Sequence, residues 1–233
     1  AEPVMKLLER KILLPGNRHF PMCVPEYRPR HLMIIGTPSL FSHSKVALFS
    51  SVHCPGELLS KGYDLAQALR RYRITVMSGF HSPLEKEMLR IFLNSTQSIL
   101  IGHARNISNM RIPAILKPPL INGRLMFFSP FLSPEMRASS KTAMERNRLI
   151  AALAELIFVV SSSPGGKIEQ LALEFQNSGR PVLAIKSKYN AHLEQQGIRC
   201  VKASKASLWL AEFGFELSTD LKDLPGLFQA ISS

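Results

Sequence analysis

The middle of the chain alternates between short apolar runs and longer segments with apolar residues at helical spacing. The apolar runs cover residues 46–49, 74–77, 98–101, 124–128, 156–160 and 182–185. They lack regular polar alternation, so they predict strands buried on both faces. The longer segments have an apolar residue about every 3.6 positions and predict helices over residues 56–72, 83–93, 141–154 and 167–177. This alternation predicts an α/β fold: a Rossmann-like open, mostly parallel sheet with helices on both faces.

The two ends of the chain have a different pattern. Residues 1–44 are rich in Pro and Arg and predict a short helix from Glu2 to Leu13, followed by an irregular wrap with isolated strand-like pieces. Residues 45–206 form the expected Rossmann-like domain. Residues 207–233 predict a C-terminal helical extension that packs on the same domain and ends in a short helix around 221–231.

Composition narrows the class of protein. The chain has 233 residues, of which 45% are hydrophobic and 20% charged, and this is enough for a core without metal or disulfides. Cys23, Cys54 and Cys200 form no C-x-x-C pair, so we expect neither a zinc site nor a disulfide framework. No apolar run reaches the roughly 18 residues of a membrane span, and the first residues lack a signal-peptide pattern. We therefore expect a cytoplasmic protein with no cofactor, no metal and no membrane contact.

Positive charge is concentrated in the middle of the chain. The chain has 29 Lys and Arg against 17 Asp and Glu, a formal net charge of +12. Between residues 105 and 148 there are eight basic and two acidic residues, whereas residues 206–233 contain one basic and four acidic residues. This distribution favours a polyanion or a phosphate-bearing ligand, and a basic protein without any anionic partner is the alternative.

Three loops that join a predicted strand to the following helix are rich in small and hydroxyl residues. Such loops meet at one edge of a parallel sheet, beyond the carboxyl ends of the strands, where ligands bind. Free backbone N–H groups at a helix N-terminus suit a phosphate. The candidate residues of these loops are Ser50, Ser51, Ser78, Gly79, Phe80, His81, Ser82, Ser163, Gly165, Gly166 and Lys167. The alternative is structural, because Ser82 also predicts an N-cap and Glu85 completes a capping box.

Arginines supply a second group of candidates. They are Arg105 and Arg111 in the basic loop, and the triplet Arg146, Asn147 and Arg148. Arg suits bidentate contact with phosphate, although pairing with a surface carboxylate such as Glu145 or Glu155 is the alternative. The chain contains neither G-x-x-x-x-G-K-[ST] nor G-x-G-x-x-G, so no motif supports an ATPase or a nicotinamide dehydrogenase.

These motifs resemble those of the DprA/Smf family of bacterial DNA-processing proteins, within the wider Smf/DprA and LOG-type Rossmann superfamily. The run R-N-R-L-I-A-A-L at residues 146–153 is close to the family's R-N-R-I-I-A-G-L, and Ser78-Gly79 matches the start of its S-G-L-A loop. The resemblance covers roughly residues 32–185. The family's G-S-R is absent after the first strand, and Lys167 stands where the P-G-G-x-G-T loop of LOG-type enzymes has Gly. The chain thus resembles a divergent, stand-alone member.

The resemblance implies a non-enzymatic, dimeric binding protein for single-stranded DNA, a mediator of DNA processing and recombination that delivers DNA to RecA. Stacking surfaces for bases are expected among four aromatic residues, Phe80, Phe127, Phe128 and Phe131. Phe127 and Phe128 lie in a predicted strand, so at least one of them is expected in the core. Two alternatives remain open. One is a binder or sensor of a small nucleotide-derived ligand at the second and third loops. The other is a LOG-like nucleotide phosphoribohydrolase with Glu85 or Glu169 as the acid/base.

Overall fold

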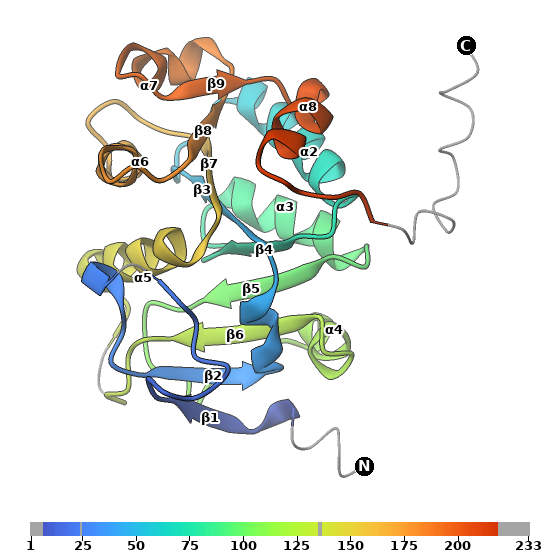
Figure 1. Ribbon diagram of the computed structural model, residues 1–233, viewed down its shortest axis with the longest axis vertical. Helices are drawn as coiled ribbons and strands as arrows, with labels where there is room; N and C mark the ends of the chain where they lie inside the picture. The colour runs from blue at the N-terminus through green and yellow to red at the C-terminus, as the bar shows by residue number, and fades with distance from the viewer. Residues whose placement is uncertain (1–6, 24, 135–136, 219–233) are drawn as a thin grey trace.

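One nine-stranded sheet organises the protein. The computed structural model describes residues 7–23, 25–134 and 137–218. The strand order is β1-β2-β6-β5-β4-β3-β7-β8-β9, with β1 at one edge and β9 at the other (Figure 1). The strands are β1 Arg10–Leu13, β2 Leu32–Gly36, β3 Lys45–Ser50, β4 Thr75–Ser78, β5 Ser98–Gly102, β6 Leu125–Ser129, β7 Leu156–Ser161, β8 Val182–Ile185 and β9 Arg199–Val201. In this order, the strands β6, β5, β4, β3, β7, β8 and β9 are all parallel to one another. Strand β2 lies between β1 and β6 and is antiparallel to both.

Helices cover both faces of this sheet. They are α2 Gly56–Leu69, α3 Pro83–Leu93, α4 Lys117–Ile121, α5 Ser140–Leu153, α6 Lys167–Asn177, α7 Ala191–Gln195 and α8 Ala206–Glu212. Short 3-10 helices are η1 Pro25–Tyr27, η2 Pro38–Ser42, η3 Ala114–Leu116, η4 Lys188–Asn190 and η5 Ala203–Lys205. Helices α2, α3 and α8 pack on one face, and α5 and α6 on the other (Figure 1). The predicted fold class is confirmed.

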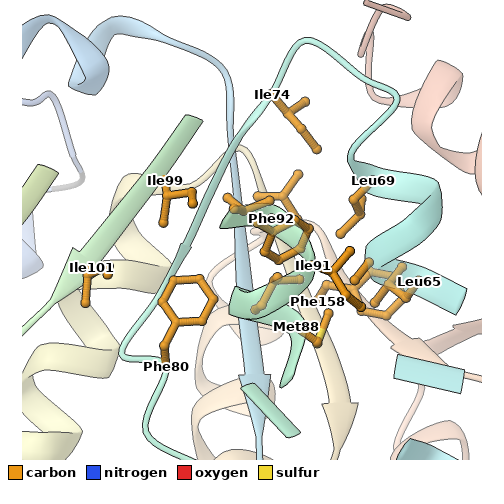
Figure 2. Close-up of a cluster of buried hydrophobic side chains, with 14 of the residues drawn as sticks. Leu65, Leu69, Ile74, Phe80, Met88, Ile91, Phe92, Ile99, Ile101 and Phe158 are labelled. Atoms are coloured by element: carbon orange, nitrogen blue, oxygen red, sulfur yellow. The ribbon is translucent and has the colours of Figure 1, made fainter. Parts of the chain in front are cut away.

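The apolar strands feed two cores because successive side chains point to opposite faces. In β3, Val46 and Leu48 belong to the core under α2 and α3, whereas Ala47 and Phe49 belong to the core under α5 and α6. Figure 2 shows the first of these cores, in which Phe92 of α3 is fully buried. Burial of one such side chain contributes about 1.5–3 kcal/mol, so the two layers of helices hold the strand ends firmly in place.

The sequence predicted most central elements and was wrong at the N-terminus. Helices α3 and α6 have the predicted bounds, and β3 to β8 match the six predicted strands. In contrast, Arg10–Leu13, expected to end a helix, form β1, which pairs antiparallel with β2. Residues 32–36, expected as an isolated strand-like piece, form β2, which pairs with β1 and β6 and is buried along its whole length. Pairing with a distant strand overrides local helical preference here. The helix predicted around 221–231 lies outside the described residues.

Within the described residues, no helix combines the length and the apolar character needed to cross a bilayer.

Candidate nucleic-acid interface

A cleft of about 1680 Å³ lies beyond the carboxyl ends of β4, β5 and β6. These three parallel strands are neighbours in the sheet, so the loops that follow them meet at the same edge. One wall comes from the loop after β4 and the adjoining turns of α3. The other walls come from residues 103–116 after β5 and from the segment that leads into α5. The cleft is therefore built from segments that are far apart in the sequence.

Cationic side chains dominate the charge of the cleft. They are Lys86, Arg90, Arg105, Arg111, Arg137 and Arg146, together with the imidazoles of His81 and His103. No Asp or Glu is found among the described residues that line it. Of the six cations, only Arg90 forms an ion pair in the described part of the chain, with the exposed Glu87 of its own helix. The cleft thus presents a positive potential to solvent, as an anion site requires.

Arg146 lies at the base of the cleft and is only 7% exposed. Its Nη1 donates to the carbonyl oxygen of Gly102 at 2.9 Å, and its Nε donates to Oδ1 of Asn147 at 2.8 Å. A Cβ atom at Gly79 would lie 2.0 Å from Nη1, so only glycine leaves room for the guanidinium at the end of β4. Arg146 lines the cleft, and its Nη2 makes no hydrogen bond within the described residues. This guanidinium is held in place with one nitrogen still available to a ligand.

Burial lowers the pKa of Arg146, and the nearby Glu85 carboxylate opposes that shift. An arginine starts from so high a pKa that it stays charged in proteins. The buried guanidinium is therefore a fixed positive charge in a medium less polar than water. Such a charge attracts a phosphate more strongly than an exposed lysine does.

Glu85 fixes the loop after β4. Its carboxylate accepts hydrogen bonds from the N–H groups of His81 at 2.8 Å, Ser82 at 3.2 Å and, across to the end of β3, Ser50 at 2.9 Å. Ser82 Oγ accepts from the N–H of Glu85, which confirms the predicted capping box. Phe80 has a left-handed backbone with φ of +47°, which costs roughly 1–2 kcal/mol. Its ring is buried in the core of Figure 2, and this burial stabilises the turn.

The loop after β5 is held by contacts with two other strands. Arg10 of β1 donates to the carbonyl oxygens of Ser108 and Met110, both at 2.9 Å. Ser129 Oγ, at the end of β6, donates to the carbonyl oxygen of Arg105 at 2.7 Å. These bonds fix the backbone and leave the side chain of Arg105 exposed on the cleft.

The third predicted loop, between β7 and α6, is closed by its own protein groups. Ser162 N–H donates to Oδ1 of the fully buried Asn190 at 3.2 Å. The N–H of Gly165 donates to the buried carboxylate of Glu169, and the N–H of Gly166 donates within the turn. The N–H groups of Ser162, Gly165 and Gly166 are therefore already hydrogen-bonded to protein atoms.

The first predicted loop is joined to that turn. Ser51 N–H donates to the carbonyl oxygen of Ser161 at 2.9 Å, which ties the end of β3 to the end of β7. The Ser50 N–H is bound by Glu85. We refer to these two loops, residues 50–55 and 161–167, as the closed turns.

The model of the family described as DNA recombination-mediator protein A matches residues 11–213. The chain belongs to this family. DNA processing protein A from Streptococcus pneumoniae superimposes with a TM-score of 0.72 and 18% identity, covering 90% of this chain and 76% of that one. A Helicobacter pylori DNA processing protein A, whose structure is described by its single-stranded DNA binding mode, gives 0.71 and 15%, covering 88% and 97%.

The fold also extends outside the family. A molybdenum cofactor carrier protein from Chlamydomonas reinhardtii gives a TM-score of 0.51 at 8% identity, covering 73% of this chain and 98% of that one. A comparison with curated protein sequences finds no match. At these identities the solved structures show a shared fold, and the site has to be argued from this chain's own residues.

Some of the predicted site residues meet in the cleft and others do not. Those that line it are Gly79, Phe80, His81, Arg105, Arg111 and Arg146. Those that lie outside its lining are Ser50, Ser51, Ser78, Ser82, Asn147, Arg148, Ser163, Gly165, Gly166 and Lys167. Asn147 still serves the cleft, because it accepts a hydrogen bond from Arg146. Arg148 points elsewhere and pairs with Glu174 of α6 at 2.9 Å, rather than with Glu145 or Glu155.

The prediction from sequence did not include several residues that line the cleft. They are Lys86, Arg90, His103 and Arg137. Lys86 and Arg90 are four residues apart on the exposed side of α3, a spacing that was visible in the sequence. His103 directly follows β5, at the edge where ligands bind in parallel sheets.

The expected aromatic stacking surfaces are wrong. Phe80, Phe127, Phe128 and Phe131 are all buried, and the most exposed of them is 7% exposed. Each takes part in the packing around the ends of β4 and β6, which removes its ring face from solvent. In contrast, the aliphatic side chain of Ile115, which also lines the cleft, is 66% exposed.

Two kinds of reactive site were considered among the described residues: a metal site and an acid/base carboxylate. No cluster of three or more His, Cys, Asp or Glu side chains is placed to hold a metal ion there. Both carboxylates considered as acid/base groups, Glu85 and Glu169, are buried and accept hydrogen bonds from backbone N–H groups.

Proposed function

We propose that this protein binds single-stranded DNA in the cationic cleft, as a non-enzymatic mediator of DNA processing. The observation that carries the proposal is the six cationic side chains, with no carboxylate among the described lining residues, at the ligand-binding edge of the sheet. Membership of the recombination-mediator family agrees with it. So does the single-stranded DNA binding named for the Helicobacter pylori relative, which shares the fold.

The cleft suits a flexible polyanion better than a single small ligand. Its six cations come from four places: Lys86 and Arg90 on α3, Arg105 and Arg111 after β5, Arg137 before α5, and Arg146 within α5. Several phosphates of one strand can contact such a spread of charge, whereas a mononucleotide would reach only part of it. A small nucleotide was the alternative ligand at the loops 78–85 and 161–167. In these loops the N–H groups of His81, Ser82, Ser162 and Gly165 already donate to protein groups. An oligonucleotide is therefore the favoured ligand.

Two arginines of the same helix give a matched test. Arg146→Ala removes the fixed guanidinium at the base of the cleft, and we expect oligothymidylate binding to weaken more than about tenfold. Arg148→Ala removes an equal charge that is paired with Glu174 outside the cleft, so binding stays within about twofold of wild type. Fluorescence anisotropy of a labelled oligonucleotide measures both, and circular dichroism verifies folding.

The salt dependence tests the chemistry of the same interface. Binding through phosphates releases counterions, so the logarithm of the affinity should fall with the logarithm of salt by about 0.7 for each phosphate contacted. Affinity that does not change between low and high salt, or equal losses in both arginine variants, contradicts the proposal. If a mononucleotide competes as well as an oligonucleotide does, the result supports the alternative of a small nucleotide ligand.

The family resemblance adds finer parts to this proposal: a dimer, delivery of the bound DNA to RecA, and a cytoplasmic location. Light scattering tests the first, since a dimer has twice the 26.0 kDa chain mass. An increase in RecA loading on protein-covered single-stranded DNA tests the second. Fractionation of cells that produce the tagged protein tests the third.

A further inference from the structure

His103 occupies an unusual place at the base of the cleft. It is the first residue after β5, and its backbone N–H donates to the carbonyl oxygen of Phe128 at 2.9 Å, which fixes its position. Its ring lies 5.5 Å from the ring of Phe127, centroid to centroid. The Nε2 atom is buried and has no hydrogen-bond partner within the described residues. An unpaired buried nitrogen is unfavourable unless a ligand completes it.

No carboxylate is among the described groups whose charge influences this imidazole. These groups are Arg146 from α5, Arg105 from the same loop and His81 from the loop after β4. Burial is the largest effect and, together with these charges, lowers the pKa of His103 to about 4. The ring is therefore neutral in the free protein at neutral pH. A bound anion reverses the electrostatic part of that shift, because it supplies the missing negative charge and a hydrogen-bond acceptor.

We propose that a DNA phosphate binds between His103 Nε2 and the unpaired Nη2 of Arg146, and that His103 takes up a proton as it binds. This inference rests on the proposed function. The one bond that forms is an N–H bond of the imidazole: the proton comes from solvent, remains on the ring while the phosphate is bound, and returns to solvent on release. Both side chains line the cleft, and the guanidinium of Arg146 is held there against Gly79 and by the carbonyl oxygen of Gly102.

The direction of the pH effect follows from linkage. His103 is neutral in the free protein above about pH 4, and it is protonated in the complex up to a higher pH. In the window between the two pKa values the complex holds one proton more than its free components. Affinity therefore rises as the pH falls through that window, by at most about tenfold per pH unit for one proton. Phosphodiesters do not titrate in this range, so the protein supplies the change.

Calorimetry measures the proton directly. Oligothymidylate is titrated into the full protein at about pH 6 in two buffers of different ionisation enthalpy, and the difference in heat gives the number of protons taken up. Thymine does not titrate near this pH. We expect a net uptake that approaches one proton in the wild type. Zero uptake, or proton release, overturns the inference.

Variants assign the proton to a residue. We expect His103→Asn to abolish the uptake, whereas His81→Asn, an exposed neighbour in the same cleft, retains it. The reverse result, or equal uptake in His103→Asn and wild type, overturns the assignment. If His103→Asn fails to fold, the wild-type heats and the His81→Asn variant still decide the question. DNA binding without proton uptake ends only this inference, whereas no DNA binding at any salt concentration or pH ends the proposed function as well.

Discussion

The cleft and the closed turns lie on the same edge of one sheet, have similar residues, and bind backbone amides to a glutamate in the same way. Two helices begin there with a glutamate in the first turn. Glu85 accepts from the N–H of His81, and Glu169 accepts from the N–H of Gly165, each four residues earlier. A carboxylate in that position occupies the N–H groups that a phosphate would need. Serine and glycine after a strand therefore predict a turn, and the glutamate decides whether its amides are free.

What distinguishes the cleft is side-chain charge rather than backbone amides. In the closed turns Lys167 is the one cation of residues 161–167, and it is exposed to solvent. At the cleft, Arg146 is buried and fixed by Gly79, Gly102 and Asn147, with further cations around it. Fixed donors bind an anion with less loss of side-chain entropy than flexible ones. The comparison assigns structural stability to the closed turns and ligand binding to the cleft.

The largest effect on DNA binding is expected from adding a single methyl group at Gly79. In Gly79→Ala the new Cβ would lie 2.0 Å from Nη1 of Arg146, so the guanidinium has to leave its place. We expect oligothymidylate binding to weaken at least about tenfold, or about 1.4 kcal/mol, with a lower melting temperature. Anisotropy and thermal unfolding measure the two effects.

Gly165→Ala is the matched control in the closed turns. Gly165 has φ of +69° and nothing within 4 Å of a Cβ, so the variant loses about 1 kcal/mol of stability through backbone strain alone. DNA binding should be unchanged. Equal loss of binding in both glycine variants would mean that the two regions form one site.

Stability, rather than DNA binding, separates the two glutamates. Glu85→Gln weakens hydrogen bonds from three N–H groups that join two loops, and we expect the free energy of unfolding to fall by about 2–3 kcal/mol. Glu169→Gln weakens one backbone bond and one to Gln196, so the expected loss is about 1–2 kcal/mol. Chemical denaturation measures both values.

DNA binding by these variants tests the roles assigned to the two regions. Glu169→Gln should bind as wild type does, because its turn lies outside the cleft. Tighter oligonucleotide binding after Glu169→Gln would show that the freed amide takes a phosphate, and the closed turns would then belong to the site.

The elements that the sequence predicted well depend on neighbours close in the chain. Apolar runs gave β3 to β8, and the Ser82–Glu85 capping box was readable because both partners lie within one turn of helix. β1 was missed because Arg10–Leu13 become a strand only when the edge of β2 is present, and the paired residues of β2 lie 19 to 25 positions away in the sequence.

The cleft could be anticipated only in part, for the same physical reason. Arg105, Arg111 and Arg146 were found from the charge pattern, but Lys86 joins them because β4 and β5 are adjacent, which periodicity does not reveal. The partner of Arg148 is Glu174, 26 residues away on α6. Stacking on bases requires exposed aromatic rings, whereas Phe127 points into one buried core and Phe128 into the other.

The smallest effect compares two exposed cations that differ only in location. Arg137 lines the cleft, whereas Lys167 lies in the closed turns. Arg137→Ala should weaken oligothymidylate binding about threefold and reduce the salt slope by about 0.7, the value for one lost phosphate contact. Lys167→Ala removes the same charge and should leave the slope unchanged. Equal losses would mean that the overall field of a chain with net charge +12 guides the DNA, because a field acts on both positions alike and a contact does not.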